Sequence, residues 1–165
     1  MDWTLILGAL ACLAACFVAA STGAVFRPGP WYEALRKPTW NPPNWLFPIA
    51  WSLLYLMIAA AGFLVWRQDG FGLPMLAWLV QLVLNAGWSW VFFGLRKLGW
   101  ATAEALAMFA AILACVLLFA PISPLAAWLM APYLVWVGFA TFLSFTIWRL
   151  NPGPQPAMGQ EAARG

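Results

Sequence analysis

Two carboxamides and two aromatic side chains recur at helical spacing in the apolar stretch between residues 70 and 95. They are Gln81, Asn85, Trp88 and Phe92, which are separated by four, three and four residues and therefore share one helix face. A carboxamide among apolar groups costs free energy unless it finds a hydrogen-bond partner. This face therefore points into a helix bundle. It serves either for hydrogen bonds between helices or as a polar anchor in a ligand cavity, and the spacing favours neither.

Tryptophan is the second residue type that could recognise a ligand, since the chain has 13 of them. An indole face stacks on flat aromatic groups, and each such pair contributes about 0.5–1.5 kcal/mol beyond burial. Four tryptophans in four different expected helices should lie in one leaflet, beneath a loop that carries Trp40. Packing is the default role for any one of them, but together they favour a pocket. These four are Trp51, Trp88, Trp100 and Trp136.

Other chemistry is limited by the residue types that the chain lacks. There is no histidine, which excludes histidine-based triads, proton relays and metal sites. Cys12, Cys16 and Cys115 fall in apolar stretches without a CxxC pair and are interpreted as packing residues. Glu104 is interpreted as an interfacial acid paired with Lys97 or another nearby base, rather than as a ligand contact. We therefore lean away from an enzyme, and we expect no metal and no covalently bound cofactor.

The composition indicates that these residues are positioned by membrane-spanning helices. The chain has 165 residues, of which 65% are hydrophobic and 8% are charged, whereas about 25% charged residues is typical of a soluble domain. A helical crossing needs about 20 apolar residues, and proline separates the last two expected crossings. We expect an all-α integral membrane domain over residues 1–150, a bundle of five transmembrane helices in the lipid bilayer. The expected spans are 4–26, 46–66, 71–94, 98–120 and 125–148.

The first loop of this bundle is expected to be structured. Residues 31–51 read WYEALRKPTWNPPNWLFPIAW, with four tryptophans and four prolines. Residues 31–37 predict a short helix with Pro30 in its first turn and an exposed ion pair between Glu33 and Lys37. Pro38 should end this helix. The segment is therefore expected to form a rigid aromatic surface over the bundle.

The basic residues predict the orientation of the chain. With five spans, seven of the eight fall on the side of the first loop and the C-terminus, and only Arg67 falls on the other. The positive-inside rule then places the N-terminus outside and the C-terminus in the cytoplasm. The basic balance reflects this asymmetry, and no nucleic-acid site is inferred from it. Residues 151–165 have no apolar periodicity and are expected to be a disordered tail.

Three segments of the chain resemble the TspO/MBR family, the tryptophan-rich sensory proteins of bacteria and the translocator protein (peripheral benzodiazepine receptor) of mitochondria. The first contains the pattern KPxWxPPxW at residues 37–45, the second the run QLVLNAGWSWVFFG, and the third the run PYLVWVGFAT. All three occur in the family's order, so the chain is identified as a bacterial member located in a bacterial membrane.

The resemblance implies a ligand pocket in the cytoplasmic half of the bundle, closed by the first loop. Family members bind porphyrins such as protoporphyrin IX, haem, sterols and synthetic drugs, and they often form homodimers. We therefore expect a tetrapyrrole-binding protein that acts as a sensor or carrier in a tetrapyrrole or stress response. Carried over position by position, the ligand-binding residues would be Trp40, Trp51, Gln81, Asn85, Trp88, Trp100, Trp136 and Ala140.

Two alternatives remain open at this point. Trp51 and Trp136 match family tryptophans connected with light- and oxygen-dependent porphyrin breakdown, so an enzyme using these two indoles is one alternative, and a transporter of porphyrins or sterols is the other. The chain also departs from the animal members. Phe145 replaces the tyrosine of their sterol motif, which implies low sterol affinity, and Asn41 and Asn44 replace histidines around the paired prolines.

Overall fold

Five long helices and one short helix make up the computed structural model, which describes residues 2–155. The long helices are α1 (Trp3–Val25), α3 (Leu46–Asp69), α4 (Leu73–Ser89) with its continuation η1 (Trp90–Gly94), α5 (Leu98–Phe119) and α6 (Pro124–Leu150). Each of the five is long and apolar enough to cross a membrane. The predicted fold class is therefore confirmed, and each predicted span end lies within three residues of the observed one.

Local sequence signals explain where several of these helices begin and end. The Asp2 carboxylate accepts a hydrogen bond from the backbone N–H of Thr4 and caps α1. Gly70 ends α3 with a φ of 69°, a conformation that a residue without Cβ adopts readily. Ser123 caps α6, and Pro124 occupies the first position of that helix, where a missing N–H costs little. The predicted proline hairpin between α5 and α6 is therefore confirmed.

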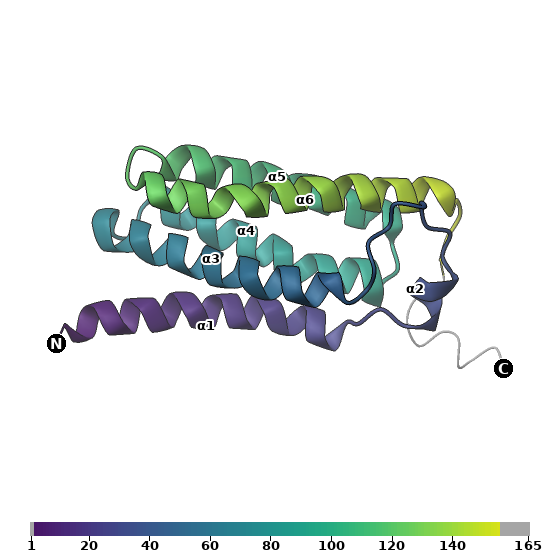
Figure 1. The fold of residues 1–165 in the computed structure, drawn as a ribbon, viewed down its shortest axis with the longest axis horizontal. Helices are drawn as coiled ribbons and strands as arrows, with labels where there is room; N and C mark the ends of the chain where they lie inside the picture. Colours follow the sequence, from purple (N-terminus) through teal and green to yellow (C-terminus); the bar gives the residue numbers. More distant parts are fainter. Residues whose placement is uncertain (1, 156–165) are drawn as a thin grey trace.

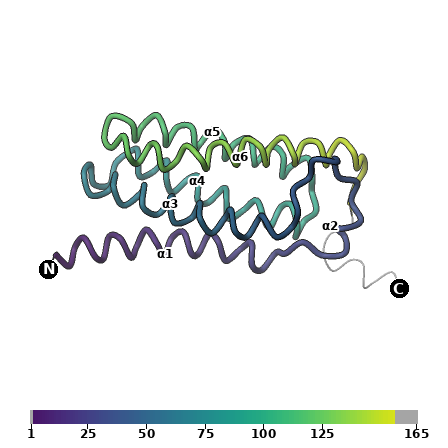
Figure 2. Tube along the Cα trace, in the orientation of Figure 1, coloured from purple at the N-terminus to yellow at the C-terminus, as the bar shows by residue number. Residues whose placement is uncertain are grey.

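The helices are arranged in three layers (Figures 1 and 2). Helix α1 lies along one side, α5 and α6 lie along the opposite side, and α3 and α4 lie between them. Helix α1 packs on α3 and α4, whereas α5 packs mainly on α6 and α4. Because the five long helices alternate in direction, α1 begins at one end of the bundle and α6 finishes at the other.

The middle layer is held by close packing around Trp78. Its ring is buried, and its Nε1 donates a hydrogen bond of 3.0 Å to the backbone oxygen of Ile58 on α3. Gly62 makes this approach possible, because a Cβ at that position would lie 2.5 Å from the indole ring. Buried side chains of α5 and α6, such as Ile112 and Met130, complete the core. Helix α3 is thereby held against α4 around Ile58 and Gly62.

The first loop covers the other end of the bundle, which we call the loop end. It runs from Phe26 to Trp45 and contains α2 (Pro30–Ala34), with Pro30 in the first turn as predicted. The short helix stops earlier than expected, because Leu35 already has an extended backbone (ψ 143°). Tyr32 and Leu35 are buried against a second apolar cluster that includes Phe92 and Ile147. The loop is thus packed onto the bundle and is positioned to close whatever lies beneath it.

Candidate ligand cavity

A cavity of about 600 Å³ lies at the loop end, between α1, α3 and α4. Its wall is mostly apolar and contains a small number of polar side chains. The lining residues are Ala20, Gly23, Ala24, Phe26, Arg27, Pro28, Tyr32, Asn44, Phe47, Pro48, Trp51, Ser52, Tyr55, Asn85, Trp88, Ser89, Phe93 and Met108. Pockets of about 300–1,000 Å³ with apolar walls and a few polar groups are typical of small-molecule sites.

Two tryptophans of the cavity wall are fixed in orientation by their neighbours. Trp88 donates a hydrogen bond from Nε1 to the backbone oxygen of Ala101 (3.1 Å) and stacks on Phe92, with ring centroids 4.8 Å apart. Trp51 packs between two tyrosine rings, Tyr55 at 5.6 Å and Tyr133 at 6.0 Å. Their indoles are therefore held in place before any ligand arrives, which lowers the entropy cost of binding a flat aromatic molecule.

The end of α4 widens into one turn of π-helix, η1, which the sequence did not predict. The backbone N–H of Leu95 bonds to the oxygen of Trp90 five residues earlier (2.8 Å). The wider turn changes the angular step between side chains, so the neighbouring residues Phe92 and Phe93 both contact Tyr32 of the loop, with centroids 6.1 and 5.6 Å away. Single π-turns inside helices are frequent at functional sites. Here the turn brings Phe93 into the cavity wall and supports the loop.

Asn85 forms the polar centre of the deep end. Its Nδ2 donates to the hydroxyl of Tyr133 on α6 (2.8 Å), and its Oδ1 accepts from the hydroxyl of Tyr55 on α3 (2.5 Å). The Tyr133 hydroxyl in turn donates to the sulfur of Met108 on α5 (3.6 Å). Through Asn85 and Tyr133 this network joins four helices. Asn85 forms interhelical hydrogen bonds and also lines the cavity, while its role as a polar anchor for a ligand stays a prediction.

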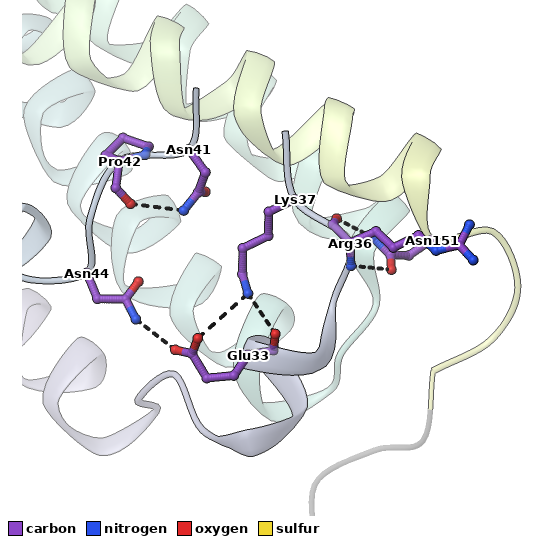
Figure 3. A network of polar contacts seen from close by, with 7 residues as sticks. All are labelled: Glu33, Arg36, Lys37, Asn41, Pro42, Asn44 and Asn151. Carbon is purple, nitrogen blue, oxygen red and sulfur yellow. Dashed lines mark hydrogen bonds and ion pairs between the residues drawn. The ribbon is translucent and has the colours of Figure 1, made fainter. Parts of the chain in front are cut away.

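The loop is tied to itself and to the end of α6 by polar contacts (Figure 3). Lys37 pairs with the carboxylate of Glu33 (3.9 Å) as predicted, and the same carboxylate accepts a hydrogen bond from Asn44 (2.7 Å). Asn151 bonds to both the backbone N–H and the backbone oxygen of Arg36 (3.0 and 2.9 Å). Residues 151–155 of the predicted tail therefore contact the loop, and residues 156–165 lie outside the described part of the chain.

Tyr32 is the ionisable group of the loop whose environment differs most from water. Burial raises the pKa of its hydroxyl, and the nearby Glu33 carboxylate raises that pKa further. The ammonium of Lys37 lies 4.4 Å from the centre of the Tyr32 ring, which fixes the ring by a cation–π contact. At neutral pH the hydroxyl is therefore protonated, and Tyr32 is one of the residues that line the cavity.

The structure brings three of the eight sequence-predicted site residues together in the cavity wall: Trp51, Asn85 and Trp88. Gln81 lies deeper on the same face of α4 and is fully buried. Its Nε2 donates to the backbone oxygen of Trp78 (2.9 Å), while its Oε1 has no hydrogen-bond partner among residues 2–155. Trp100 is 72% exposed on the outside of the bundle and does not line the cavity.

The other three predicted residues lie on α6 or contact it. Trp136 contacts Phe47 with ring centroids 5.9 Å apart, so Phe47 separates it from the cavity, and Ala140 follows one turn later on α6. Trp40 lies flat on Phe142 at 5.4 Å and edge-on to Phe139 at 5.8 Å. Trp40 therefore packs the loop against α6. Trp40, Trp136 and Ala140 are not among the residues that line the cavity.

The prediction for Glu104 was wrong. In the part of the chain that the structure describes, Glu104 makes no ion pair, and its Oε2 is buried without a hydrogen-bond partner. Its other oxygen packs against Gly87 of α4, where a Cβ would lie 2.5 Å away. The carboxyl group points at the neighbouring helix instead of reaching the basic residues near Lys97, because the absence of a side chain at Gly87 leaves room for it.

Several lining residues were missed by the sequence analysis, among them Arg27, Tyr32, Phe47 and Tyr55. Tyr55 follows Trp51 by four residues, so the helical spacing used for α4 would have found it on α3 as well. Arg27 is the first charge after α1, and its place at the cavity depends on how the loop folds back. No group of residues suited to hold a metal ion is present among residues 2–155.

The fold and the cavity define the class: a multi-pass helical membrane protein with an aromatic-walled cavity closed at one end by a loop. The TspO/MBR family profile matches residues 9–149, so the chain belongs to this family. It is 40% identical to the tryptophan-rich sensory protein of Cereibacter sphaeroides over 151 residues, which is 92% of this chain and 94% of that protein.

Two further relatives extend the similarity. Protein CrtK of Rhodobacter capsulatus is 40% identical over 146 residues, covering 86% of this chain and 91% of that protein. The human translocator protein is 39% identical over 128 residues, covering 74% of this chain and 76% of the human one. The similarity thus extends from bacterial members to a human member.

Proposed function

We propose that the protein binds tetrapyrroles, either a porphyrin or haem, in the loop-end cavity and acts as a sensor or carrier in a tetrapyrrole or stress response. The observation that carries this proposal is the pair of fixed indoles, Trp51 and Trp88, in an apolar cavity of about 600 Å³. A flat aromatic macrocycle can stack on such rings and fill such a volume. The name of the Cereibacter sphaeroides relative, tryptophan-rich sensory protein, agrees with a sensing role.

The same features support a choice among ligands. Sterols are expected to bind weakly, because Phe145, at the position of the sterol-motif tyrosine, is 42% exposed on the outside of α6 and packs against Trp148. With no histidine in the chain, haem is expected to bind through its macrocycle rather than through a histidine–iron bond. We further propose that the chain forms a homodimer in a bacterial membrane, with the loop end in the cytoplasm.

A titration of the purified protein with protoporphyrin IX, haem and cholesterol, performed side by side, tests the ligand assignment. The expected result is saturable quenching of tryptophan fluorescence by the two tetrapyrroles and much weaker binding of cholesterol. Saturable binding of cholesterol with no binding of either tetrapyrrole would contradict the proposal. Chromatography with light scattering on the same sample measures whether the protein is a dimer.

One observation favours a second candidate function, the light- and oxygen-dependent breakdown of porphyrin. Trp51 lines the cavity and contacts the rings of Tyr55 and Tyr133, so an electron lost by its indole could be replaced from a neighbouring phenol. Trp136 lies behind Phe47 and is less well placed for this role. Illumination of the protoporphyrin complex in air separates the two functions. Loss of the Soret band that requires Trp51 indicates breakdown, whereas a stable band indicates binding alone.

A further inference from the structure

Among the residues that line the loop-end cavity, Arg27 is the only charged one. Arg27 lies two residues after the end of α1, where the cavity wall changes from apolar helix residues to loop residues. The polar residues Tyr32 and Asn44 line the same end of the cavity, while no acidic residue contributes to the wall. The cavity therefore has an apolar body and a cationic mouth.

The side chain of Arg27 is oriented by the end of α1 and keeps donors for a ligand. Its Nε donates a hydrogen bond of 2.7 Å to the backbone oxygen of Ala24, one of the carbonyls that have no partner within the helix. Among residues 2–155, the Arg27 side chain makes this one hydrogen bond and forms no ion pair with an acidic residue. The Nε edge of the guanidinium is thus held by Ala24, and the hydrogens of the two terminal nitrogens are not used by residues 2–155.

The acidic residue of the loop does not neutralise this cation. The Glu33 carboxylate is held by Lys37 at 3.9 Å and by Asn44 at 2.7 Å, so its charge is balanced within the loop (Figure 3). A carboxylate that enters the mouth of the cavity would therefore meet Arg27 without a competing protein anion. Planar guanidinium groups bind carboxylates through two parallel hydrogen bonds, a geometry that lysine does not offer.

We propose that Arg27 determines the specificity of the cavity by binding a carboxylate on the edge of the ligand. The ligand class is then a flat apolar body with at least one carboxylate on its rim: the body lies against Trp51 and Trp88 and the carboxylate at the loop. This inference rests on the proposed function and deepens it, because it separates carboxylated tetrapyrroles from neutral molecules of the same shape.

The test compares protoporphyrin IX with its dimethyl ester, which has the same macrocycle but no carboxylate. Both are titrated into the wild type, Arg27→Gln, Arg27→Lys and the control Arg36→Gln, in nanodiscs of zwitterionic lipid. Arg36 belongs to the same loop and carries the same charge, but its side chain does not line the cavity. The wild type should prefer the acid by about tenfold, the typical effect of one charge-assisted hydrogen bond.

The expected pattern is that Arg27→Gln loses this preference by binding the acid more weakly and the ester unchanged. Arg27→Lys should keep part of the preference, and Arg36→Gln should keep all of it. Binding of acid and ester with equal affinity by the wild type would overturn the assignment of Arg27 and leave the proposed function standing. An equal loss in Arg36→Gln would also overturn it, because the preference would then come from the overall charge of the loop. Binding of neither porphyrin by the wild type would contradict the proposed function itself.

Discussion

The side-chain amide of Asn85 donates a hydrogen bond to the hydroxyl of Tyr133, and this 2.8 Å contact joins α4 to α6 at the deep end of the cavity. Asn85 is thus a structural residue and a cavity-lining residue at once. Its substitution should affect both the fold and the ligand, and the two effects can be separated through Tyr133, which does not line the cavity.

Replacing Asn85 with leucine should destabilise the protein and weaken protoporphyrin binding. The hydroxyls of Tyr55 and Tyr133 both lose their hydrogen bond to Asn85, and hydrogen bonds between membrane helices contribute about 0.6–2 kcal/mol each. Tyr133→Phe removes one of these bonds and leaves the wall unchanged. It should lower the melting temperature in detergent, measured by circular dichroism, without changing affinity. If Asn85→Leu and Tyr133→Phe reduce affinity equally, the amide acts on the ligand only through the fold.

Replacing Trp40 with alanine should loosen the first loop. The stacked contact with Phe142 and the edge contact with Phe139 are both lost, while the cavity wall keeps its residues. Trypsin should then cleave after Arg36 faster than in the wild type, and bound porphyrin should dissociate faster. Trp128→Ala is the matched control, since Trp128 is an exposed tryptophan near the start of α6, at the end of the bundle that faces away from the loop. Equal cleavage rates in the two variants would show that Trp40 does not fasten the loop.

Replacing Gly62 with alanine should be among the most damaging small substitutions in the core. The new Cβ would lie 2.5 Å from the buried ring of Trp78, and overpacking of this kind costs about 1–3 kcal/mol. Gly29→Ala is the control, because a Cβ there meets no atom within 4 Å. Thermal unfolding in detergent should show a clear loss for Gly62→Ala alone. Similar melting temperatures for both variants would mean that α3 and α4 are not held together at this contact.

The orientation of the chain can be tested by reporter fusions. Described basic residues at the loop end include Arg27, Arg36, Lys37, Arg96, Lys97 and Arg149, whereas Arg67 lies at the other end. The positive-inside rule then predicts a cytoplasmic reporter after Gly165 and a periplasmic reporter before Met1. Reporters on the same side would contradict the alternation of five spans, and a reversed pair would contradict the cytoplasmic placement of the loop.

The spans could be predicted from the sequence because the bilayer imposes their length. Charges and prolines mark the ends of apolar runs of about 20 residues. The ends of the five spans were therefore predicted to within three residues. The π-turn at Trp90–Gly94 could not be predicted in this way. Its side chains fit an α-helix equally well by periodicity, and the contacts of Phe92 and Phe93 with Tyr32 of the loop join residues about 60 positions apart in the sequence.

The cavity was predicted less completely than the fold. Helical spacing correctly placed Asn85 and Trp88 on an inward face, but spacing does not show which inward residues meet a cavity and which meet another helix. Trp136 is still separated from the cavity by Phe47, and Trp100, in the first turn of α5, is exposed on the outside of the bundle. Arg27 depends on the path of the loop, which is set by tertiary contacts such as those of Asn151 with Arg36.

The most direct test of ligand binding in this cavity is to fill it. Ala20 of α1 lines the cavity, whereas Ala14 of the same helix is exposed outside it, so Ala20→Phe and Ala14→Phe add the same volume on opposite sides of the wall. Protoporphyrin IX is titrated into both variants and the wild type, with affinity read from tryptophan quenching. The account predicts that Ala20→Phe binds at least tenfold more weakly, roughly the effect of one blocked contact of 1.4 kcal/mol, while Ala14→Phe matches the wild type. Unchanged affinity in a folded Ala20→Phe variant would contradict it.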